Sequence, residues 1–215
     1  MTLANFTLYT SNLSANGRKV LAVSQHLGLM PEVNEVNVYE GEGSAETYRT
    51  LNPFGKIPTL VHDDFVLWES NAIIQYIDDA FGESRLSGDT PRARADVARW
   101  LFWEAAHWQP AITTVLAAHV GHVLLPQYVP VPTQTPEWDY DGFLPLIHVL
   151  EAHLADRTYL VDNTLTLADF SVAAMMTYFQ VGQFPFIRYP AVTRWYESLS
   201  SLAAWQQTAV KLWQP

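Results

Sequence analysis

The hydrophobic pattern of the chain changes once, near residue 85, and this change constrains the fold more than any other feature. Before it, short strand-like apolar runs alternate with segments whose apolar residues recur at helical spacing. After it, the periodic segments are all helical. Residues 83–91 are short, polar and contain Gly88 and Pro91, so we predict a linker there. We therefore expect an α/β domain over residues 1–82 and an all-α domain over residues 92–215.

The first domain is predicted to have the element order β-α-β-(α)-β-β-α. Its expected elements are strands at Phe6–Tyr9, Glu32–Val38, Ile57–His62 and Phe65–Leu67, with helical segments after Asn16, around Ala45–Leu51 and over Glu69–Phe81. The first two strands are joined through a helix, which favours parallel pairing. Asp63-Asp64 separates the last two strands and predicts a hairpin.

The second domain is predicted to be a bundle of amphipathic helices. Its expected helices are Ala93–Leu125, Asp141–Leu154, Thr166–Gln183, Ala191–Leu199 and a shorter one from Leu202. Pro110 lacks an N–H group and should bend the first of them. The segment 105–136 has no Asp, Glu, Lys or Arg. Because histidines and prolines interrupt it, we expect a buried helix rather than a membrane span.

Composition excludes several classes of function. The net charge is −10, with 12 Lys and Arg against 22 Asp and Glu, so the surface should repel the phosphate backbone of a nucleic acid. The chain has no cysteine, so any thiol chemistry must use a thiol that a substrate supplies. His119 and His122 stand at helical spacing without a paired carboxylate, and we predict no metal site. We see no signal peptide after Met1 and expect a cytoplasmic protein without membrane association.

The stretch from Asn52 to Leu60, read as NPFGKIPTL, predicts a turn that leads into a strand. Pro58 lies at the strand start, where it cannot donate a ladder hydrogen bond. Two interpretations are open. If the Ile57–Pro58 bond is cis, the backbone of Ile57 can pair with an extended peptide; otherwise Pro58 is an ordinary trans proline at a strand edge.

Two further motifs open helices. Ser14 and Asn16 precede the first helix of the chain, and Glu69 and Ser70 precede another. Such residues commonly cap helix N-termini. The alternative is binding: a hydroxyl at Ser14 could hold an incoming sulfur, and the second helix end with Glu69 suits an α-amino acid, which carries both charges.

These motifs together resemble those of soluble glutathione transferases. Three pieces occur in order, namely Ser14-x-Asn16-Gly17-x-Lys19-Val20, Asn52-Pro53-x-Gly55-Lys56-Ile57-Pro58 and Glu69-Ser70-Asn71-Ala72-Ile73. A fourth, Thr166-Leu167-Ala168-Asp169, is similar to the capping box of that family's helical half. The resemblance covers essentially the whole chain and implies a thioredoxin-like βαβαββα domain followed by a helical bundle domain.

The resemblance implies a serine-type, bacterial-like enzyme. Ser14 would stabilise the glutathione thiolate, with Asn16 as a second polar donor near the sulfur. Tyr9 invites comparison with tyrosine-type members, but it falls inside the predicted strand, so Ser14 is preferred. No cysteine-type class fits, because the chain has no cysteine.

The remaining glutathione contacts also follow from the resemblance. Ile57, before Pro58, would pair through its backbone with the cysteinyl unit, and Lys56 would meet the glycine carboxylate. Glu69 and Ser70 would hold the γ-glutamyl end. Glutathione would be a co-substrate, and no metal is implied.

A small hydrophobic electrophile would be the second substrate, lying against the long aromatic helix, where we select Trp103 and His107. The expected activity is conjugation to glutathione. The alternatives are a glutathione-dependent peroxide or disulfide reductase and a non-catalytic ligand-binding or interaction module. The resemblance also predicts a homodimer.

Overall fold

The computed structural model describes residues 2–134 and 136–210 and divides the chain into two compact units. Among the described residues, the first unit contains those up to Ser87 together with residues 203–210, and the second runs from Gly88 to Leu202. The sequence prediction assigned all residues from 92 to 215 to the helical domain. The structure differs at the C-terminal end, where the last helix belongs to the first unit. Residues 211–215 of the predicted domain lie outside the described residues.

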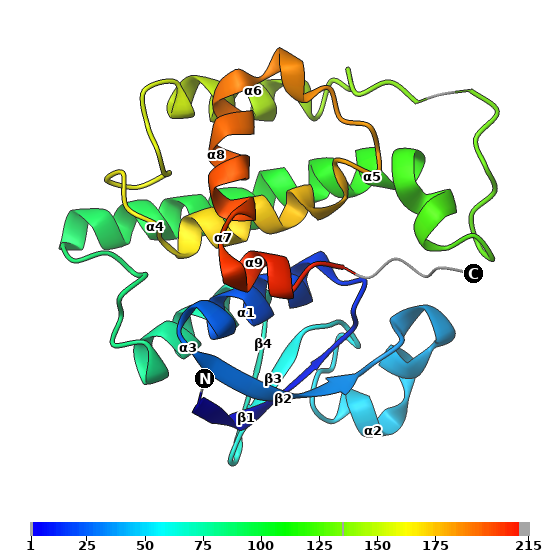
Figure 1. The fold of residues 1–215 in the computed structure, drawn as a ribbon. Helices are drawn as coiled ribbons and strands as arrows, with labels where there is room; N and C mark the ends of the chain where they lie inside the picture. Colours follow the sequence, from blue (N-terminus) through cyan, green and yellow to red (C-terminus); the bar gives the residue numbers. More distant parts are fainter. Residues whose placement is uncertain (1, 135, 211–215) are drawn as a thin grey trace. The chain divides into compact units, whose positions relative to one another are not determined.

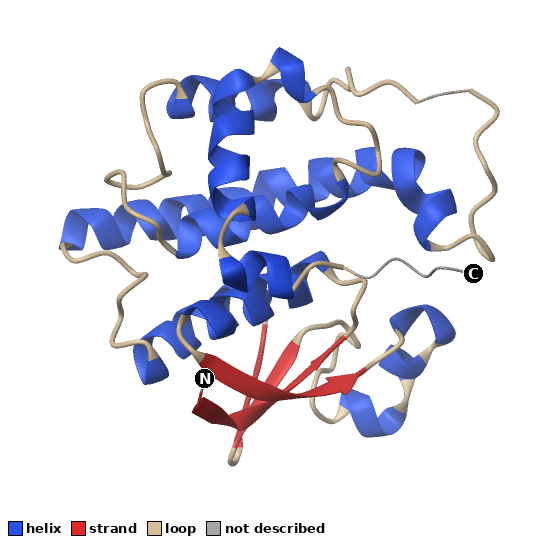
Figure 2. Ribbon diagram, viewed as in Figure 1, coloured by secondary structure: helices blue, strands red, loops and turns tan. Residues whose placement is uncertain are grey.

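The first unit is built on a four-stranded sheet (Figures 1 and 2). Its elements are β1 (Thr2–Thr10), α1 (Ala15–His26), β2 (Leu29–Glu35), the 3-10 turns η1 (Val38–Glu40) and η2 (Glu42–Ser44), α2 (Glu46–Arg49), β3 (Thr59–His62), β4 (Phe65–Trp68) and α3 (Ser70–Phe81). The strand order is β2-β1-β3-β4, with β1 and β2 parallel and the other pairs antiparallel. The predicted parallel crossover and the predicted hairpin are both confirmed.

Alternation along β1 separates the two faces of the sheet. Phe6 and Leu8 are buried, and the ring of Phe6 contacts Phe81 of α3 with centroids 5.4 Å apart. Tyr9, one position further along, points the other way, and its ring lies 6.1 Å from that of Tyr48 in α2. Helices α1 and α3 therefore lie on one side of the sheet (Figure 1), and the contact of Tyr9 with Tyr48 places the α2 side chain on the other side.

The short helix α9 (Ala203–Gln207) packs against α1 and completes the first unit. Arg18 of α1 is buried, and its Nη2 donates to the carbonyl oxygen of Trp205 at 3.0 Å. The same guanidinium lies over the Trp205 ring, 4.2 Å from the centroid. A buried guanidinium needs acceptors, and the C-terminal helix supplies one of them.

The second unit is helical in its described residues (Figure 2). Its elements are α4 (Pro91–Trp103), the π-helical turn η3 (Glu104–Trp108), α5 (Gln109–Leu124), α6 (Leu144–Leu154), α7 (Leu167–Ala174), the 3-10 turns η4 (Met175–Tyr178) and η5 (Phe186–Arg188), and α8 (Pro190–Ser200). The predicted long helix is continuous through η3, and the irregularity expected at Pro110 takes the form of a wider turn just before it. A proline has no N–H for the regular i→i−4 bond, which favours a change of hydrogen-bond pattern here. The predicted helix 166–183 was too long, because its α-helical part ends at Ala174.

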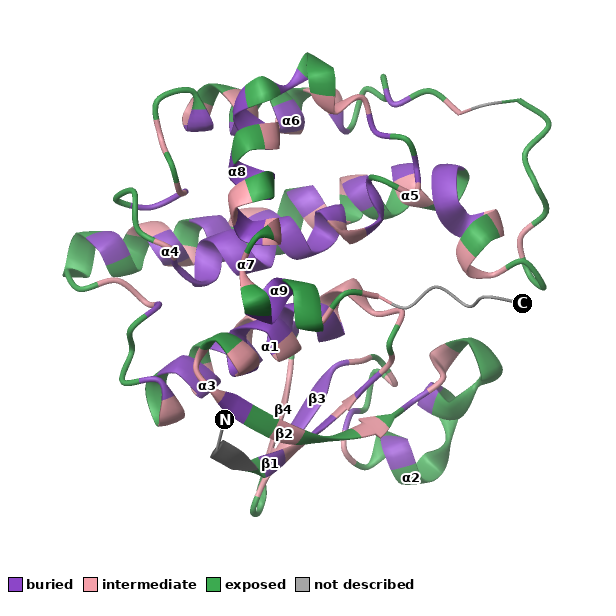
Figure 3. Cartoon of the chain, in the orientation of Figure 1, coloured by how far each residue is buried: buried purple, intermediate pink, exposed green. Residues whose placement is uncertain are grey.

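Helix α7 forms the centre of the second unit, and all eight of its residues are buried (Figure 3). It begins with a capping box in which Thr166 and Asp169 bond each other's backbone N–H groups. Asp169 also accepts from the backbone N–H of Leu160 and from Trp195 Nε1, both at 2.9 Å. This carboxylate therefore ties α7 to the preceding loop and to α8.

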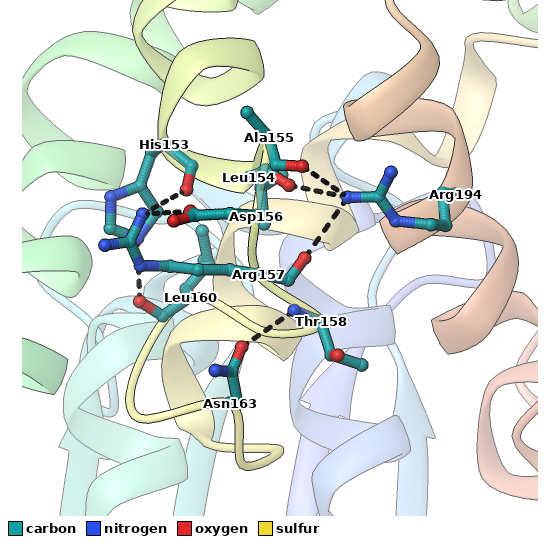
Figure 4. A network of polar contacts seen from close by, with 9 residues as sticks. All are labelled: His153, Leu154, Ala155, Asp156, Arg157, Thr158, Leu160, Asn163 and Arg194. Atoms are coloured by element: carbon teal, nitrogen blue, oxygen red, sulfur yellow. Dashed lines mark hydrogen bonds and ion pairs between the residues drawn. The ribbon is translucent and has the colours of Figure 1, made fainter.

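The connection between α6 and α7 is held by bonds from side chains to the backbone (Figure 4). Arg194 Nη2 donates to the carbonyl of Leu154 at 2.6 Å, where α6 ends. Asn163 Oδ1 accepts from the N–H of Thr158 at 2.8 Å. These bonds satisfy helix-end and loop groups that would otherwise need water. None of the helices in the described part of the chain is both long and apolar enough to cross a bilayer.

Candidate functional site

Ser14 occupies the N-cap of α1. Its Oγ accepts from the N–H of Gly17 at 2.9 Å, and its carbonyl accepts from the N–H of Arg18 at 2.8 Å. The side chain is half-buried. Accepting a bond uses only a lone pair of the hydroxyl, and within the described residues no acceptor takes its proton. Capping and donation to a substrate sulfur are therefore compatible roles of the same oxygen.

Gly17 lets the first turn of α1 approach the end of β1. A Cβ at this position would lie 1.9 Å from Thr10 Oγ1. Any larger residue would push the helix start, and Ser14 with it, away from the sheet. The glycine of this motif is therefore explained by packing rather than by backbone conformation.

A chain of polar contacts links the starts of α1 and α3. Ser70 Oγ donates to Asn16 Oδ1 at 3.1 Å. Lys19 Nζ donates to Ser70 Oγ at 3.1 Å and to Asn71 Oδ1 at 2.9 Å. Lys19 has no exposed surface and Ser70 is 8% exposed, so these contacts form in a region that water reaches poorly. Two predicted site residues, Asn16 and Ser70, are thus in direct contact.

The backbone at Glu69 takes a conformation that few residues other than glycine adopt. Its φ is 74° and its ψ is 110°, and it is the N-cap residue of α3 without a side-chain capping bond. Non-glycine residues with positive φ are uncommon and concentrate at functional sites. The Glu69 side chain is exposed. The start of α3 therefore has an N-cap side chain that makes no capping bond, and it places an exposed carboxylate beside the first turn of the helix.

The loop from Asn52 to Pro58 is held from beneath by buried side chains. The Asn52 Nδ2 group donates to the carbonyl of Lys56 at 2.8 Å, and Tyr48 O–H donates to the same carbonyl at 2.7 Å. The Ile57–Pro58 peptide bond is cis, and the pairing of Ile57 with an extended peptide stays a prediction. Among the described residues, neither the N–H nor the C=O of Ile57 has a backbone partner, because the strand pairing of β3 begins at Thr59. Ile57 is half-buried, and the Lys56 side chain is exposed.

Two glycines bring this loop against the turn that follows β2. A Cβ at Gly43 would lie 2.3 Å from the carbonyl oxygen of Gly55, and a Cβ at Gly55 would lie 2.3 Å from that of Gly43. The two backbones touch here, and no side chain fits between them. Gly55 also has a φ of 64°. The position of the cis-proline loop therefore depends on a contact 12 residues earlier in the chain.

Tyr9 does not share the surroundings of Ser14. Its ring lies on the α2 side of the sheet, where it lines an open cavity of about 380 Å³ with Tyr48, Leu51 and neighbouring residues. None of the other residues that the sequence motifs selected for the site lines this cavity. This placement supports the preference for Ser14 over Tyr9.

Comparison with known proteins matches separate family profiles to the α/β part and to the helical part of the chain. Two family profiles match it, described as glutathione S-transferase N-terminal domain over residues 8–85 and C-terminal domain over residues 144–203. Glutathione S-transferase F13 of Arabidopsis thaliana is 30% identical over 207 residues, which are 92% of this chain and 91% of that protein. The chain belongs to the glutathione S-transferase family.

Two further members of the glutathione S-transferase family support this assignment. Glutathione S-transferase GstB of Escherichia coli (strain K12) is 29% identical over 205 residues, covering 92% of this chain and 94% of GstB. The crystal structure of glutathione transferase URE2P8 from Phanerochaete chrysosporium with oxidized glutathione has a TM-score of 0.78 and 25% identity, covering 95% of this chain and 93% of that one. The resemblance seen in the sequence motifs is therefore confirmed.

In this glutathione S-transferase the two residues selected for the electrophile lie where α4 meets the π-helical turn. Trp103 is half-buried and stacks on Trp108, with centroids 5.4 Å apart and an interplanar angle of 22°. His107 is exposed. The aromatic side chains of this segment are thus divided between the core, to which Trp108 belongs, and the surface. The contact of Trp103 and His107 with a substrate stays a prediction.

One of the two histidines of α5 has a packing role. His119 is buried and stacks on Trp138, with ring centroids 4.2 Å apart. Burial lowers the pKa of His119, and hydrogen bonds to the backbone at Glu137 and Gly182 oppose that shift. No group of three or more potential metal ligands occurs among the described residues.

Three residues that hold the candidate site in place were not singled out in the sequence. Lys19 stood inside the first motif, but helical spacing alone gave no reason to expect a fully buried ammonium group. Asn52 was interpreted as a turn former, whereas its side chain is 2% exposed and supports the loop that contains Lys56. Tyr48 lies in a short helix without a periodic signal. Only the family motif itself could have drawn attention to these residues.

Proposed function

We propose that the chain is a glutathione transferase that binds glutathione in its first unit and uses Ser14 to stabilise the thiolate. The observation that carries this proposal is the N-cap geometry of Ser14. Its oxygen already accepts from the N–H of Gly17, so the hydroxyl is held in one place while its proton stays available for an anion. The names of the relatives, which are glutathione S-transferases, support the reaction class.

The energetic requirement for thiol activation is small. A cysteinyl thiol has a pKa of about 8.5, so only a few per cent is thiolate at neutral pH. Lowering that pKa by about two units needs roughly 2.7 kcal/mol of preferential stabilisation of the anion. One O–H donor to a charged acceptor supplies about 1.5–3 kcal/mol, and a helix N-terminus adds about 0.3–1 kcal/mol. Ser14 and the start of α1 are sufficient, and no general base is needed.

The γ-glutamyl end is proposed to bind at the start of α3. This helix has 12 residues and no side-chain cap at Glu69, so its first amides and the positive end of its dipole can meet a carboxylate. The exposed carboxylate of Glu69 suits the α-ammonium group. Ser70 belongs to the same turn. Its backbone N–H is proposed to donate to the γ-glutamyl carboxylate, while its hydroxyl contacts Asn16.

The middle and the glycine end are proposed to lie along the cis-proline loop. The backbone of Ile57 offers one donor and one acceptor without partners in the described structure, which suits pairing with the cysteinyl unit. Lys56 next to it has an exposed side chain that could meet the glycine carboxylate. Asn52 and Tyr48 hold the Lys56 carbonyl, so the loop is preorganised for these contacts.

The second substrate is proposed to be a small hydrophobic electrophile that contacts Trp103 and His107. Holding thiolate and electrophile together would supply the remaining rate acceleration through proximity. Homodimer formation and a cytoplasmic location are proposed on the family resemblance.

The test is a pH titration of glutathione bound to wild type, Ser14→Ala, Ser14→Thr and the neighbouring control Ser11→Ala, followed by the ultraviolet absorbance of the thiolate. We expect Ser14→Ala to bind glutathione with a thiol pKa raised by about one to two units. Ser14→Thr keeps both the cap and the hydroxyl, and it should resemble wild type, as should Ser11→Ala.

Equal thiol pKa values in wild type and Ser14→Ala would refute the role of Ser14. A wild-type protein that binds no glutathione would favour the non-catalytic module. Assays with an aryl halide, a hydroperoxide and a glutathione disulfide then distinguish conjugation from reduction.

A further inference from the structure

Lys19 is a buried cation in the middle of the candidate site. Its side chain has no exposed surface, and lysine is among the residues that are least often fully buried. It lies in α1, one turn after Asn16, and its Nζ donates to Ser70 Oγ and Asn71 Oδ1 at the start of α3. Transferring an ammonium group from water to the interior costs free energy, and an apolar side chain would fill the same space without that cost. A role of Lys19 in the site therefore explains its burial better than packing does.

The chemistry of the three groups determines the direction of their hydrogen bonds. An ammonium group can only donate, so Ser70 Oγ must accept from Lys19. The single proton of Ser70 then has to go elsewhere, and within the described residues Asn16 Oδ1 is the acceptor at 3.1 Å. If the amide of Asn16 were turned over, its NH₂ would face Ser70 Oγ, and the buried Ser70 hydroxyl would lose that acceptor.

The orientation of Asn16 follows from this chain. Because its Oδ1 is occupied by Ser70, its Nδ2 points to the other side of the amide. Asn16 lies two residues after Ser14, in the first turn of α1, where the sulfur of glutathione is proposed to bind. The NH₂ group then serves as a second donor to the thiolate. The opposite orientation would place a carbonyl oxygen near the anion and disfavour it.

We propose that Lys19 is a positioning residue for thiol activation: through Ser70 it fixes the amide of Asn16 so that the NH₂ group faces the glutathione sulfur. The inference rests on the proposed function. Lys19 touches neither substrate in this arrangement and acts through Asn16.

A double-mutant cycle distinguishes this role from a simple effect of positive charge. The thiol pKa of bound glutathione is measured in wild type, Lys19→Met, Asn16→Ala and the double variant. We expect each single substitution to raise that pKa by about one unit, because each removes the same oriented donor. The double variant should also be raised by about one unit, since Lys19 has nothing to orient once Asn16 is gone.

The matched control is Arg18→Met. Arg18 is the neighbouring buried cation of α1, but its guanidinium faces Trp205 rather than Ser70. If the positive charge of a buried α1 residue does not by itself stabilise the thiolate, Arg18→Met should change the pKa of the bound thiol by less than about 0.3 units. Additive shifts in the double variant would overturn the inference, because Lys19 would then act through its own charge. A Lys19→Met protein with a wild-type thiol pKa would also overturn it.

A second measurement does not depend on the folding of Lys19→Met. The side-chain NH₂ resonances of Asn16 are assigned in wild type by their loss in Asn16→Ala and followed while bound glutathione is titrated. They should shift with the ionisation of the bound thiol and not in the complex with S-methylglutathione, which cannot ionise. Resonances that do not respond to thiol ionisation would overturn the inference, whereas a wild type that does not ionise glutathione would overturn the proposed function as well.

Discussion

Asp169 gives the sharpest stability prediction for the second unit. Its side chain is fully buried and accepts four hydrogen bonds, from the N–H groups of Leu160 and Thr166, from Thr166 Oγ1 and from Trp195 Nε1. Burial raises the pKa of Asp169 to about 6 and the hydrogen bonds oppose this, so the carboxylate is mostly ionised at pH 7.5. Asp169→Ala would remove the acceptor for all four donors at once.

The cost can be estimated from the donors that are left. The hydroxyl of Thr166 can rotate, but the two backbone N–H groups and the indole N–H cannot. Each buried donor without a partner costs about 1–3 kcal/mol, so three of them destabilise the fold by roughly 3–9 kcal/mol. That is a large part of the 5–15 kcal/mol typical of a whole domain. At about 2–4 °C per kcal/mol, the melting temperature should fall by at least about 6 °C.

The assay is urea unfolding at pH 7.5, followed by tryptophan fluorescence and by circular dichroism. Asp156→Ala is the matched control, because Asp156 lies at the end of α6, is 80% exposed and makes only a surface pair with Arg157. The control should change the free energy of unfolding by less than about 0.5 kcal/mol. If Asp169→Ala costs no more than this control, the carboxylate is not the link between α7, the preceding loop and α8.

Two further outcomes follow from packing and burial. Gly43→Ala would place a Cβ 2.3 Å from the Gly55 carbonyl oxygen, so we expect the folded state to lose about 1–3 kcal/mol of stability and the KM for glutathione to rise. Ser44→Ala, at an exposed position, is the control. A Gly43→Ala enzyme with an unchanged KM would contradict a role of this contact in positioning the loop. The pKa of His119 is lowered by burial, so its contribution to stability is present above the unfolded-state pKa of about 6.5 and is lost as pH falls toward the folded-state pKa. His119→Phe keeps the stack on Trp138 and cannot titrate, so the stability of wild type relative to this variant should fall between pH 7.5 and 5.5 in urea titrations; a constant difference would argue against a perturbed His119.

The element order of the first unit was predictable because its strands and helices have strong periodic signals and clear turn residues. Asp63-Asp64 correctly marked the hairpin between β3 and β4. Boundaries were less certain where tertiary contacts decide them. The helix predicted from Asp141 begins at Leu144, and the one predicted to reach Gln183 changes to a 3-10 turn after Ala174.

The candidate site was predictable as a set of motifs but not as a network. The motifs identified Ser14, Asn16 and Ser70. A sequence does not show whether such a side chain caps a helix or donates a hydrogen bond to a substrate. The buried position of Lys19 and the support of the Lys56 carbonyl by Asn52 depend on segments far apart in the chain. A single sequence contains no signal for such contacts unless a family motif is recognised.

The return of α9 to the first unit has a consequence for the order in which the protein is made. A ribosome completes β1 to α3 long before it reaches Trp205, so more than 110 further residues (88 to 202) are added before Arg18 can bond to the carbonyl of Trp205. The described part of the helical unit, in contrast, has all its residues once Leu202 has been added. An isolated fragment that ends near Ser87 would therefore expose the surface of α1 that α9 normally covers.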